Sequence, residues 1–174
     1  MGNPHVPKSV KYFASLIFGS DISLREAEGE LVSFIGKIEE TTGLIPFVHS
    51  NYYDKELGER LSRVFLLFEP LLHRELLPDI KLKTNVIERM LSTGSKRTVN
   101  IDPGYIALEH VILATTKGYS HRIYLNKGIY GDLTLMYQNG TYKALEWTYP
   151  DYREAETIFI MNKWRDIYKR MLKC

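Results

Sequence analysis

The pattern of hydrophobic and polar positions changes its period several times along the first hundred residues. A mostly apolar run from Val10 to Phe18 is typical of a buried strand. Ser23 and Glu26 then form a capping box, and apolar residues recur at helical spacing from Leu24 to Ile35. Gly36 follows the last of them, so the pattern predicts a strand followed by a helix that ends at this glycine.

A second, similar set of elements follows. Residues 37–48 are a mixed extended segment, and residues 61–68 are a second apolar strand. Pro78 can open a helix whose apolar stripe is Leu82, Val86 and Met90, widened by Ile80, Ile87 and Leu91. Residues 97–101 read as a fourth strand. This order predicts a ferredoxin-like split βαβ half (βαββαβ) over about residues 9–102, with the first and third strands central and the second and fourth at the edges.

The second half, about residues 105–174, has a different pattern. The apolar stretch 106–114 fits either a helix or a strand. Three strand patterns follow, separated by loops at 126–128 and 138–140 that each end in glycine, and an amphipathic helix runs from about Glu154 to Leu172. The sequence therefore predicts an α+β protein, a single domain over 1–174, in which a C-terminal antiparallel β-meander and a closing helix extend the first half.

Three-residue loops in this meander set a register that can be tested. They place Arg122 opposite Asp132, and Asp132 opposite Glu146. Two facing carboxylates need a shared proton, a cation or the neighbouring guanidinium, so this row is either a charged site or an exposed salt-bridge row on a solvated sheet face. A two-residue loop at Asn139-Gly140 would mix the apolar and polar faces, which favours the three-residue loop.

The segment Arg97-Thr98-Val99-Asn100-Ile101-Asp102-Pro103-Gly104-Tyr105 carries the other candidate site. Pro-Gly fits the central positions of a type II turn, which predicts that Asp102 is held at the end of its strand. Alternation places Asn100 and Asp102 on one face. Their oxygens could orient a substrate, bind a divalent cation such as Mg²⁺ or supply a general base; alternatively, Asp102 makes an Asx turn and Asn100 ties down a loop.

Basic and aromatic side chains complete the hypothesis. Lys83 and Arg97 could meet a phosphate or carboxylate, although such residues also form the wet face of helices. Tyrosines could form the walls of a site or be half-buried packing residues; they are Tyr105, Tyr124 and Tyr130, the last two facing each other in the predicted register.

Together these features favour a cytoplasmic enzyme or binding protein for a small anionic or nucleotide-like ligand, with a polar cleft between the two halves. Asn100, Asp102, Asp132 and Glu146 would supply the catalytic or metal-binding oxygens, and Arg122, Lys83 and Arg97 would meet the anion. The rival hypothesis is a non-catalytic RNA- or protein-interaction module that uses an aromatic sheet face.

Composition narrows these classes. A formal net charge of +2 argues against nonspecific nucleic-acid binding, unless the basic residues segregate in three dimensions. Cys174 is the only cysteine, which excludes an internal disulfide framework and suits the cytoplasm. No apolar run has the length of a membrane span, and a single glutamine is typical of heat-adapted proteins. The sequence has no GxxxxGK[ST], GxGxxG or GxSxG motif, which argues against P-loop, Rossmann and serine hydrolase chemistry.

Several segments resemble a prokaryotic family of uncharacterised small proteins, domain of unknown function 4416. They include Pro7-Lys8-Ser9-Val10-Lys11, Tyr52-Tyr53-Asp54-Lys55-Glu56-Leu57-Gly58, Ile80-Lys81-Leu82-Lys83-Thr84-Asn85, residues 99–105, His121-Arg122-Ile123-Tyr124-Leu125 and Trp147-Thr148-Tyr149-Pro150-Asp151-Tyr152. The resemblance spans nearly the whole chain. It implies a prokaryotic origin and brings no activity, cofactor or site residue with it.

Overall fold

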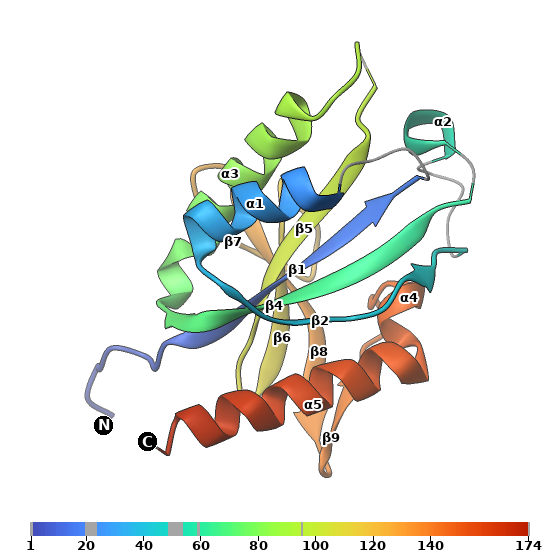
Figure 1. Ribbon diagram of the computed structural model, residues 1–174. Helices are drawn as coiled ribbons and strands as arrows, with labels where there is room; N and C mark the ends of the chain where they lie inside the picture. Colours follow the sequence, from blue (N-terminus) through green and yellow to red (C-terminus); the bar gives the residue numbers. More distant parts are fainter. Residues whose placement is uncertain (1, 20–23, 49–53, 59, 95, 174) are drawn as a thin grey trace.

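The computed structural model describes residues 2–19, 24–48, 54–58, 60–94 and 96–173, and within these ranges the chain is a mixed α+β protein (Figure 1). The strands are β1 (Val10–Phe18), β2 (Ile38–Thr41), β3 (Ile45–Pro46), β4 (Ser62–Leu72), β5 (Val99–Ile106), β6 (His110–Thr115), β7 (Arg122–Asn126), β8 (Ile129–Gln138) and β9 (Thr141–Ala144). The helices are α1 (Leu24–Ile35), α2 (Asp54–Leu57), α3 (Leu77–Met90), α4 (Pro150–Arg153) and α5 (Ala155–Met171), with a 3₁₀ turn at Arg74–Leu76. The stretch 106–114, which fitted either a helix or a strand, contains no helix: Ile106 ends β5, residues 107–109 form the connection, and residues 110–114 belong to β6.

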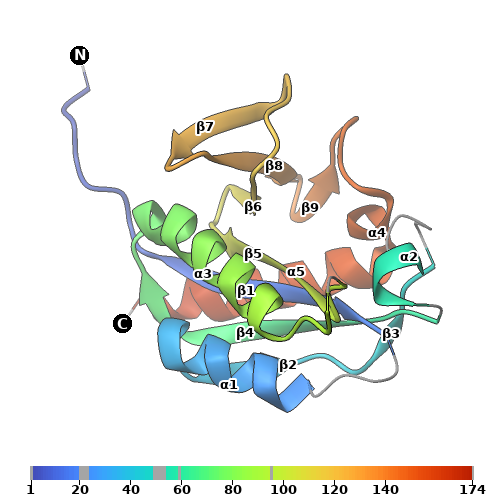
Figure 2. The same ribbon diagram turned by 90° about the horizontal axis from the view of Figure 1, so that it is seen from above.

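The strands form one antiparallel sheet in the order β2-β4-β1-β5-β6-β8-β7, with β3 paired to β4 and β9 paired to β8. Of the first four predicted strands, the first and third are β1 and β4, which lie side by side inside the sheet. The prediction that the fourth strand is an edge was wrong. This strand is β5, and the sheet continues beyond it through β6, β8 and β7 (Figure 2).

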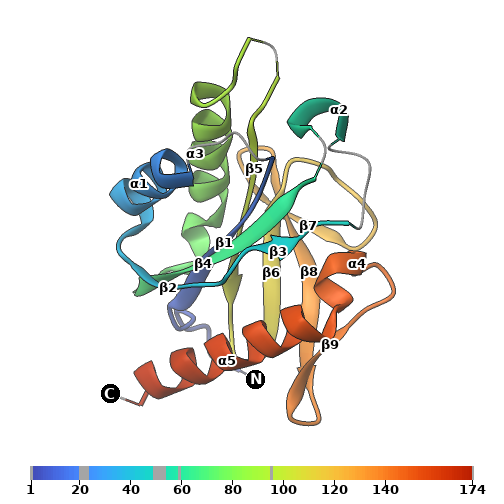
Figure 3. The same cartoon turned by 45° about the vertical axis from the view of Figure 1, so that its right-hand side comes forward.

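Alternate residues of the central strands supply two separate cores, one on each face of the sheet. Tyr12 and Leu16 of β1 join a cluster with α1 and α3, whereas Phe13 joins a cluster with Trp164 and Met161 of α5. The two sets of helices therefore cover opposite faces (Figure 3). All nine residues of β1 are buried because both faces are covered.

Helix α3 buries a different face from the one that its apolar spacing predicts. Leu82, Val86 and Met90 are exposed, and the buried side includes Lys81 and Glu88 together with the predicted flanking residues Ile80 and Ile87. The helix is rotated so that polar side chains face β5. The contacts described below give the physical reason for this rotation.

The two meander hairpins agree with the predicted register in part. In the first, Arg122 faces Asp132 and Tyr124 faces Tyr130, as predicted, but the predicted three-residue loop is wrong. Asn126 pairs with Ile129, which leaves a two-residue loop, and a bulge between Tyr124 and Asn126 keeps the predicted register. In the second, Gln138 pairs with Thr141, so the loop has two residues and the predicted pairing of Asp132 with Glu146 is wrong. Asn139 and Gly140 both have positive φ values, 51° and 84°, as a type I′ turn requires. The preference of Asn-Gly for this turn overrides the apolar alternation.

The predicted turn at Pro103-Gly104 is also absent, because β5 continues straight through both residues to Ile106. Gly104 is needed here for space. A Cβ atom at this position would lie 2.5 Å from the carbonyl oxygen of Ile112 and 2.9 Å from the ring of Phe13. Strand β6 can therefore approach β5 closely at this point only if the residue has no side chain.

None of the described helices is long and apolar enough to cross a membrane. Ser23, which the sequence predicts to cap α1, lies outside the described residues.

Replacing Gly104 with alanine should destabilise the protein by about 2–3 kcal/mol, because backbone and a buried ring both have to move. The matched control is Gly29→Ala in α1, where a Cβ meets nothing within 4 Å. That substitution should stabilise the protein by up to about 1 kcal/mol through helix propensity. Urea unfolding of both variants tests this, and equal effects at the two positions would contradict it.

Candidate functional site

The sheet opens between β5 and β6. These strands pair only where residues 104–106 face residues 111–113. Along β5 the odd-numbered residues present their backbone groups toward β6, as the pairing of Tyr105 with Ile112 and the bond from Ala107 N to His110 O show. Pro103 belongs to this set and has no N–H. The ladder therefore ends at Gly104, and β6 separates from the first half of β5.

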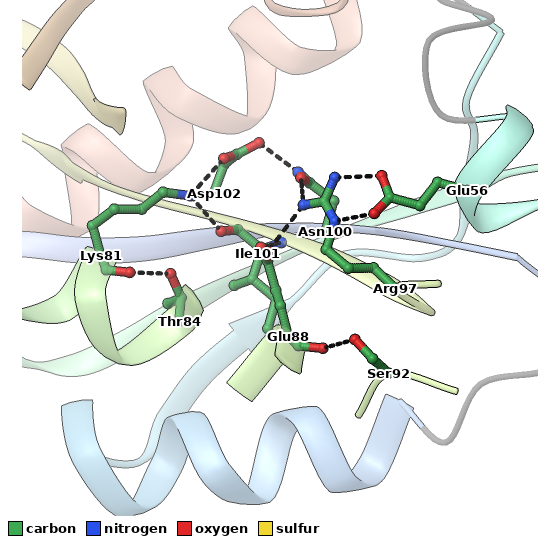
Figure 4. A network of polar contacts seen from close by, with 9 residues as sticks. All are labelled: Glu56, Lys81, Thr84, Glu88, Ser92, Arg97, Asn100, Ile101 and Asp102. Carbon is green, nitrogen blue, oxygen red and sulfur yellow. Dashed lines mark hydrogen bonds and ion pairs between the residues drawn. The ribbon is translucent and has the colours of Figure 1, made fainter. Parts of the chain in front are cut away.

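Side chains from α3 take the place of the missing strand at Ile101. The Ile101 N–H donates to Glu88 Oε1 at 2.6 Å, and the Ile101 carbonyl accepts a bond from Lys81 Nζ at 3.0 Å (Figure 4). Burial of a strand edge without such partners would leave two backbone groups unsatisfied. This requirement explains why α3 turns Lys81 and Glu88 inward.

A chain of polar contacts continues from Lys81 across β5. Lys81 Nζ also donates to Asp102 Oδ1 at 3.0 Å, and Asn100 Nδ2 donates to Asp102 Oδ2 at 2.7 Å. Arg97 Nη1 donates to both Asn100 Oδ1 and Glu88 Oε2 at 3.0 Å. Glu56 of α2 holds the other side of the Arg97 guanidinium through two bonds of 2.7 Å (Figure 4). The predicted pair Asn100 and Asp102 thus belongs to one charged network.

The environment shifts two carboxyl groups of this network in opposite directions. Burial raises the pKa of Glu88, although Lys81, the Ile101 N–H and Arg97 oppose the shift. At Asp102 burial also acts upward, but the charge of Lys81 and the hydrogen bonds from Lys81 and Asn100 hold the pKa below its usual value. Asp102 is therefore an anion at neutral pH, and its side chain remains 34% exposed.

The gap beside β5 is a cavity of about 520 Å³. Its walls carry as many cationic as acidic side chains. The cations are Arg63, Lys81, Arg97 and Lys117; the acids are Glu88, Asp102, Asp132 and Asp151; the amides are Asn85 and Asn100; the aromatic residues are Phe47, Tyr149 and Tyr152. Elements from both faces of the sheet contribute, because the missing pairing lets α3 side chains reach through it.

On the meander side, Asp132 anchors a second polar cluster. Arg122 Nε donates to Asp132 Oδ2 at 2.8 Å, and His121 Nε2 lies 3.3 Å from the same oxygen. Arg122 Nη2 donates to the Tyr149 hydroxyl at 2.6 Å. His121 stacks on Trp147 with ring centroids 5.1 Å apart. The predicted pair of Arg122 and Asp132 is thus a nearly buried ion pair in which Asp132 lines the cavity and Arg122 lies next to it.

The structure brings together some of the predicted site residues and separates others. Asn100, Asp102, Asp132 and Arg97 line the cavity, and Arg122 contacts it through Asp132 and Tyr149. The others are not among the lining residues. Glu146 is exposed, Lys83 points toward Glu30 of α1 at 3.9 Å, Tyr105 packs in the α1–α3 core, and Tyr124 and Tyr130 pack on each other.

The cavity also contains residues that the sequence-based site omits, chiefly Arg63, Glu88 and Asp151. A signal for two of them exists. Arg63 is a charge beside the apolar run 64–68 of its strand, and Glu88 lies one position from Ile87 on the core side of α3. Asp151 has no such signal, because it comes near β4 only through the tertiary fold.

This arrangement suits hydrogen bonding and charge recognition better than metal binding. In the described part of the chain, no three His, Cys, Asp or Glu side chains are grouped so as to hold a metal ion. Each Asp102 oxygen already accepts a bond, from Lys81 or from Asn100. Asn85, in contrast, makes no side-chain hydrogen bond with a described residue and lines the cavity.

A family model described as a domain of unknown function (DUF4416) matches residues 8–168. The chain belongs to this family. No curated protein and no solved structure matches the chain. Membership in DUF4416 leaves the site to be interpreted from its own chemistry.

Replacing Lys81 with methionine should destabilise this DUF4416 protein by about 2 kcal/mol, because it leaves the Ile101 carbonyl and the Asp102 carboxylate without their cation. The matched control is Lys83→Met, whose lysine is partly exposed and lies 3.9 Å from Glu30. That change should alter stability by less than about 0.5 kcal/mol. Urea unfolding at neutral pH measures both, and comparable losses would contradict the assignment.

The Lys81→Met destabilisation should also depend on pH. In the wild type the folded pKa of Asp102 is lowered, so its contribution to stability is present above about pH 3.9 and is lost as the pH falls through the folded value. In the variant, burial without Lys81 should raise this pKa, and stability should then decrease as the pH rises. The difference in free energy of unfolding between the wild type and Lys81→Met should therefore grow from acidic to neutral pH. Carboxyl ¹³C NMR of Asp102 and unfolding at several pH values test this; a constant difference would refute it.

Proposed function

We propose that this protein binds a small anionic or nucleotide-like ligand in the cavity between β5 and β6, as a binding protein or as an enzyme. One observation carries the proposal. The interrupted β5–β6 pairing leaves a space of about 520 Å³ into which charged side chains from α3, β4, β5 and β8 converge. Small-molecule sites in proteins typically occupy about 300–1,000 Å³.

The polar groups of the cavity suit a ligand that carries both an anion and hydrogen-bonding groups. Lys81 has three N–H donors and uses two of them, for Ile101 and Asp102. Its remaining donor is suited to a ligand oxygen. Asp102 and the Asn85 amide, which has no side-chain hydrogen bond to a described residue, are suited to hydroxyl or amino groups of the same ligand. In an enzyme, the ionised Asp102 would orient the substrate or accept a proton from it.

We also propose that residues 9–102 form a ferredoxin-like unit within a single domain. The strand order β2-β4-β1-β5 and the position of α1 and α3 on one face of these strands support this. The cysteine and glutamine content supports a cytoplasmic setting and a heat-adapted source.

A thermal-shift screen against metabolites, nucleotides and divalent ions tests the ligand proposal. A ligand present at about a hundred times its Kd should raise the Tm by about 5–10 °C. Asp102→Ala should remove most of this shift. Glu146→Ala, an exposed site outside the cavity lining, should keep it. A ligand whose effect is the same in all three proteins would place its site elsewhere and contradict the proposal.

A second candidate function, a protein-interaction module, is supported by one surface. Strand β7 ends the sheet, and Ile123 is 73% exposed on it, with Tyr124 and Leu125 also exposed. An edge strand with exposed apolar side chains is suited to pairing with another strand. The apolar character favours a protein partner over RNA, and the simplest partner is the β7 strand of a second copy.

Sedimentation velocity over a range of concentrations tests this second function. The wild type should self-associate as concentration rises, and Ile123→Glu should remain monomeric because a charge would replace the apolar contact. Phe159→Glu is the control, since Phe159 is equally exposed but lies on α5. A wild type that stays monomeric throughout would contradict pairing between copies.

A further inference from the structure

Arg63 of β4 is the least satisfied charged group that lines the cavity. The residue is only 4% exposed. Its Nη2 forms an ion pair with Asp151 of α4, while its buried Nε has no acceptor in the part of the chain that the structure describes. A guanidinium has five N–H donors, so one carboxylate partner leaves much of its capacity unused.

Aromatic rings enclose this guanidinium without replacing the missing acceptors. The Arg63 carbon Cζ lies 4.8 Å from the ring centroid of Phe47, 5.1 Å from that of Phe65 and 5.4 Å from that of Tyr152. These contacts stabilise the cation through the ring faces. They offer no lone pairs in the plane of the guanidinium, where its N–H groups point. A buried donor without an acceptor is unfavourable unless another group supplies one.

We propose that Arg63 is the anion anchor of the cavity and takes an oxyanion of the ligand, a carboxylate or a phosphate group. This inference rests on the proposed function, because it assigns one end of the same ligand. Phe47 and Tyr152 line the cavity beside Arg63, so the part of the ligand next to its anion packs against aromatic rings. Arg63 then bridges two anions, Asp151 of the protein and the oxyanion of the ligand.

The competing explanation is structural: Arg63 and Asp151 simply join β4 to α4. The two explanations differ in what the guanidinium fork does. A purely structural ion pair does not respond to small anions. An anchor changes its Nε–H environment when an anion arrives, and a lysine, which keeps the charge but lacks the fork, replaces it poorly.

The test is an NMR titration of the ¹⁵N-labelled full chain, following the Arg63 Nε–H signal, with inorganic phosphate in one arm and acetate in the other. Chloride keeps the ionic strength constant. The signal should shift in a saturable way with at least one of the two anions, and the arm that responds identifies phosphate or carboxylate as the preferred group. An Arg63 signal that moves with neither anion overturns the inference, and this readout needs no variant.

Variants provide the second arm, read from backbone signals of Phe47 and Tyr152. Arg63→Lys should weaken anion binding roughly tenfold or more. Arg153→Lys is the matched control, because among the described residues the Arg153 guanidinium bonds the backbone oxygens of Thr148 and Glu146 and no carboxylate. Equal affinity in the wild type and Arg63→Lys overturns the inference.

The two proposals fail in different ways. A ligand from the thermal-shift screen that depends on Asp102 but binds Arg63→Lys unchanged leaves the cavity function intact and removes Arg63 as its anchor. If no ligand or anion perturbs any residue of the cavity, the proposed function fails together with the anchor.

Discussion

The absence of an N–H group on Pro103 is the constraint on which the cavity depends. At the edge of β5 that faces β6, this residue cannot donate to a ladder, so the pairing ends at Gly104 and the sheet opens. Gly104 holds the last pair because β6 passes so close that a side chain would not fit. The backbone groups of the buried, unpaired strand edge at Ile101 must then bond other groups, and Lys81 and Glu88 supply these bonds. An opening in the sheet and a polar helix face are therefore two consequences of one missing donor.

The charges around this opening are organised in pairs before any ligand arrives. Lys81 is held by Asp102, and Arg97 is held by Glu88 and Glu56. Partly buried pairs of this kind contribute little net stability, because removing charges from water offsets much of their attraction, but they fix the positions of their members. Arg63 differs from these residues, because it is nearly buried and its Nε–H has no acceptor among the described residues. The cavity thus combines a preorganised network on β5 with an incompletely paired cation on β4.

Sequence patterns predicted the elements well and the contacts between them unevenly. The main strands and helices of the first half follow the predicted sequence of elements, with the short β3 and α2 added between β2 and β4, because local periodicity is enough to mark them. Arg122 faces Asp132 as predicted, although the loop has two residues and a bulge, so the register agrees for a different reason. The predicted apolar stripe of α3 was wrong, since a helix is oriented by what it must satisfy as well as by its apolar residues. The predicted row from Asp132 to Glu146 was wrong because the Asn-Gly turn sets a register one residue away from the apolar alternation.

The sequence by itself determined that Asn100 and Asp102 share one face of a strand and that Pro103, directly after them, cannot donate a backbone hydrogen bond. Local geometry is enough for both, because alternation and the missing N–H are properties of the chain itself. Only the tertiary structure decided that Pro103 lies at a gap between two strands and not in a turn. It also brought Lys81 from the opposite face of the sheet to Asp102, and Arg63 into the same cavity. The physical reason is that a hydrogen bond or an ion pair depends on distance in space, and no periodicity along the chain records which strand edge remains open.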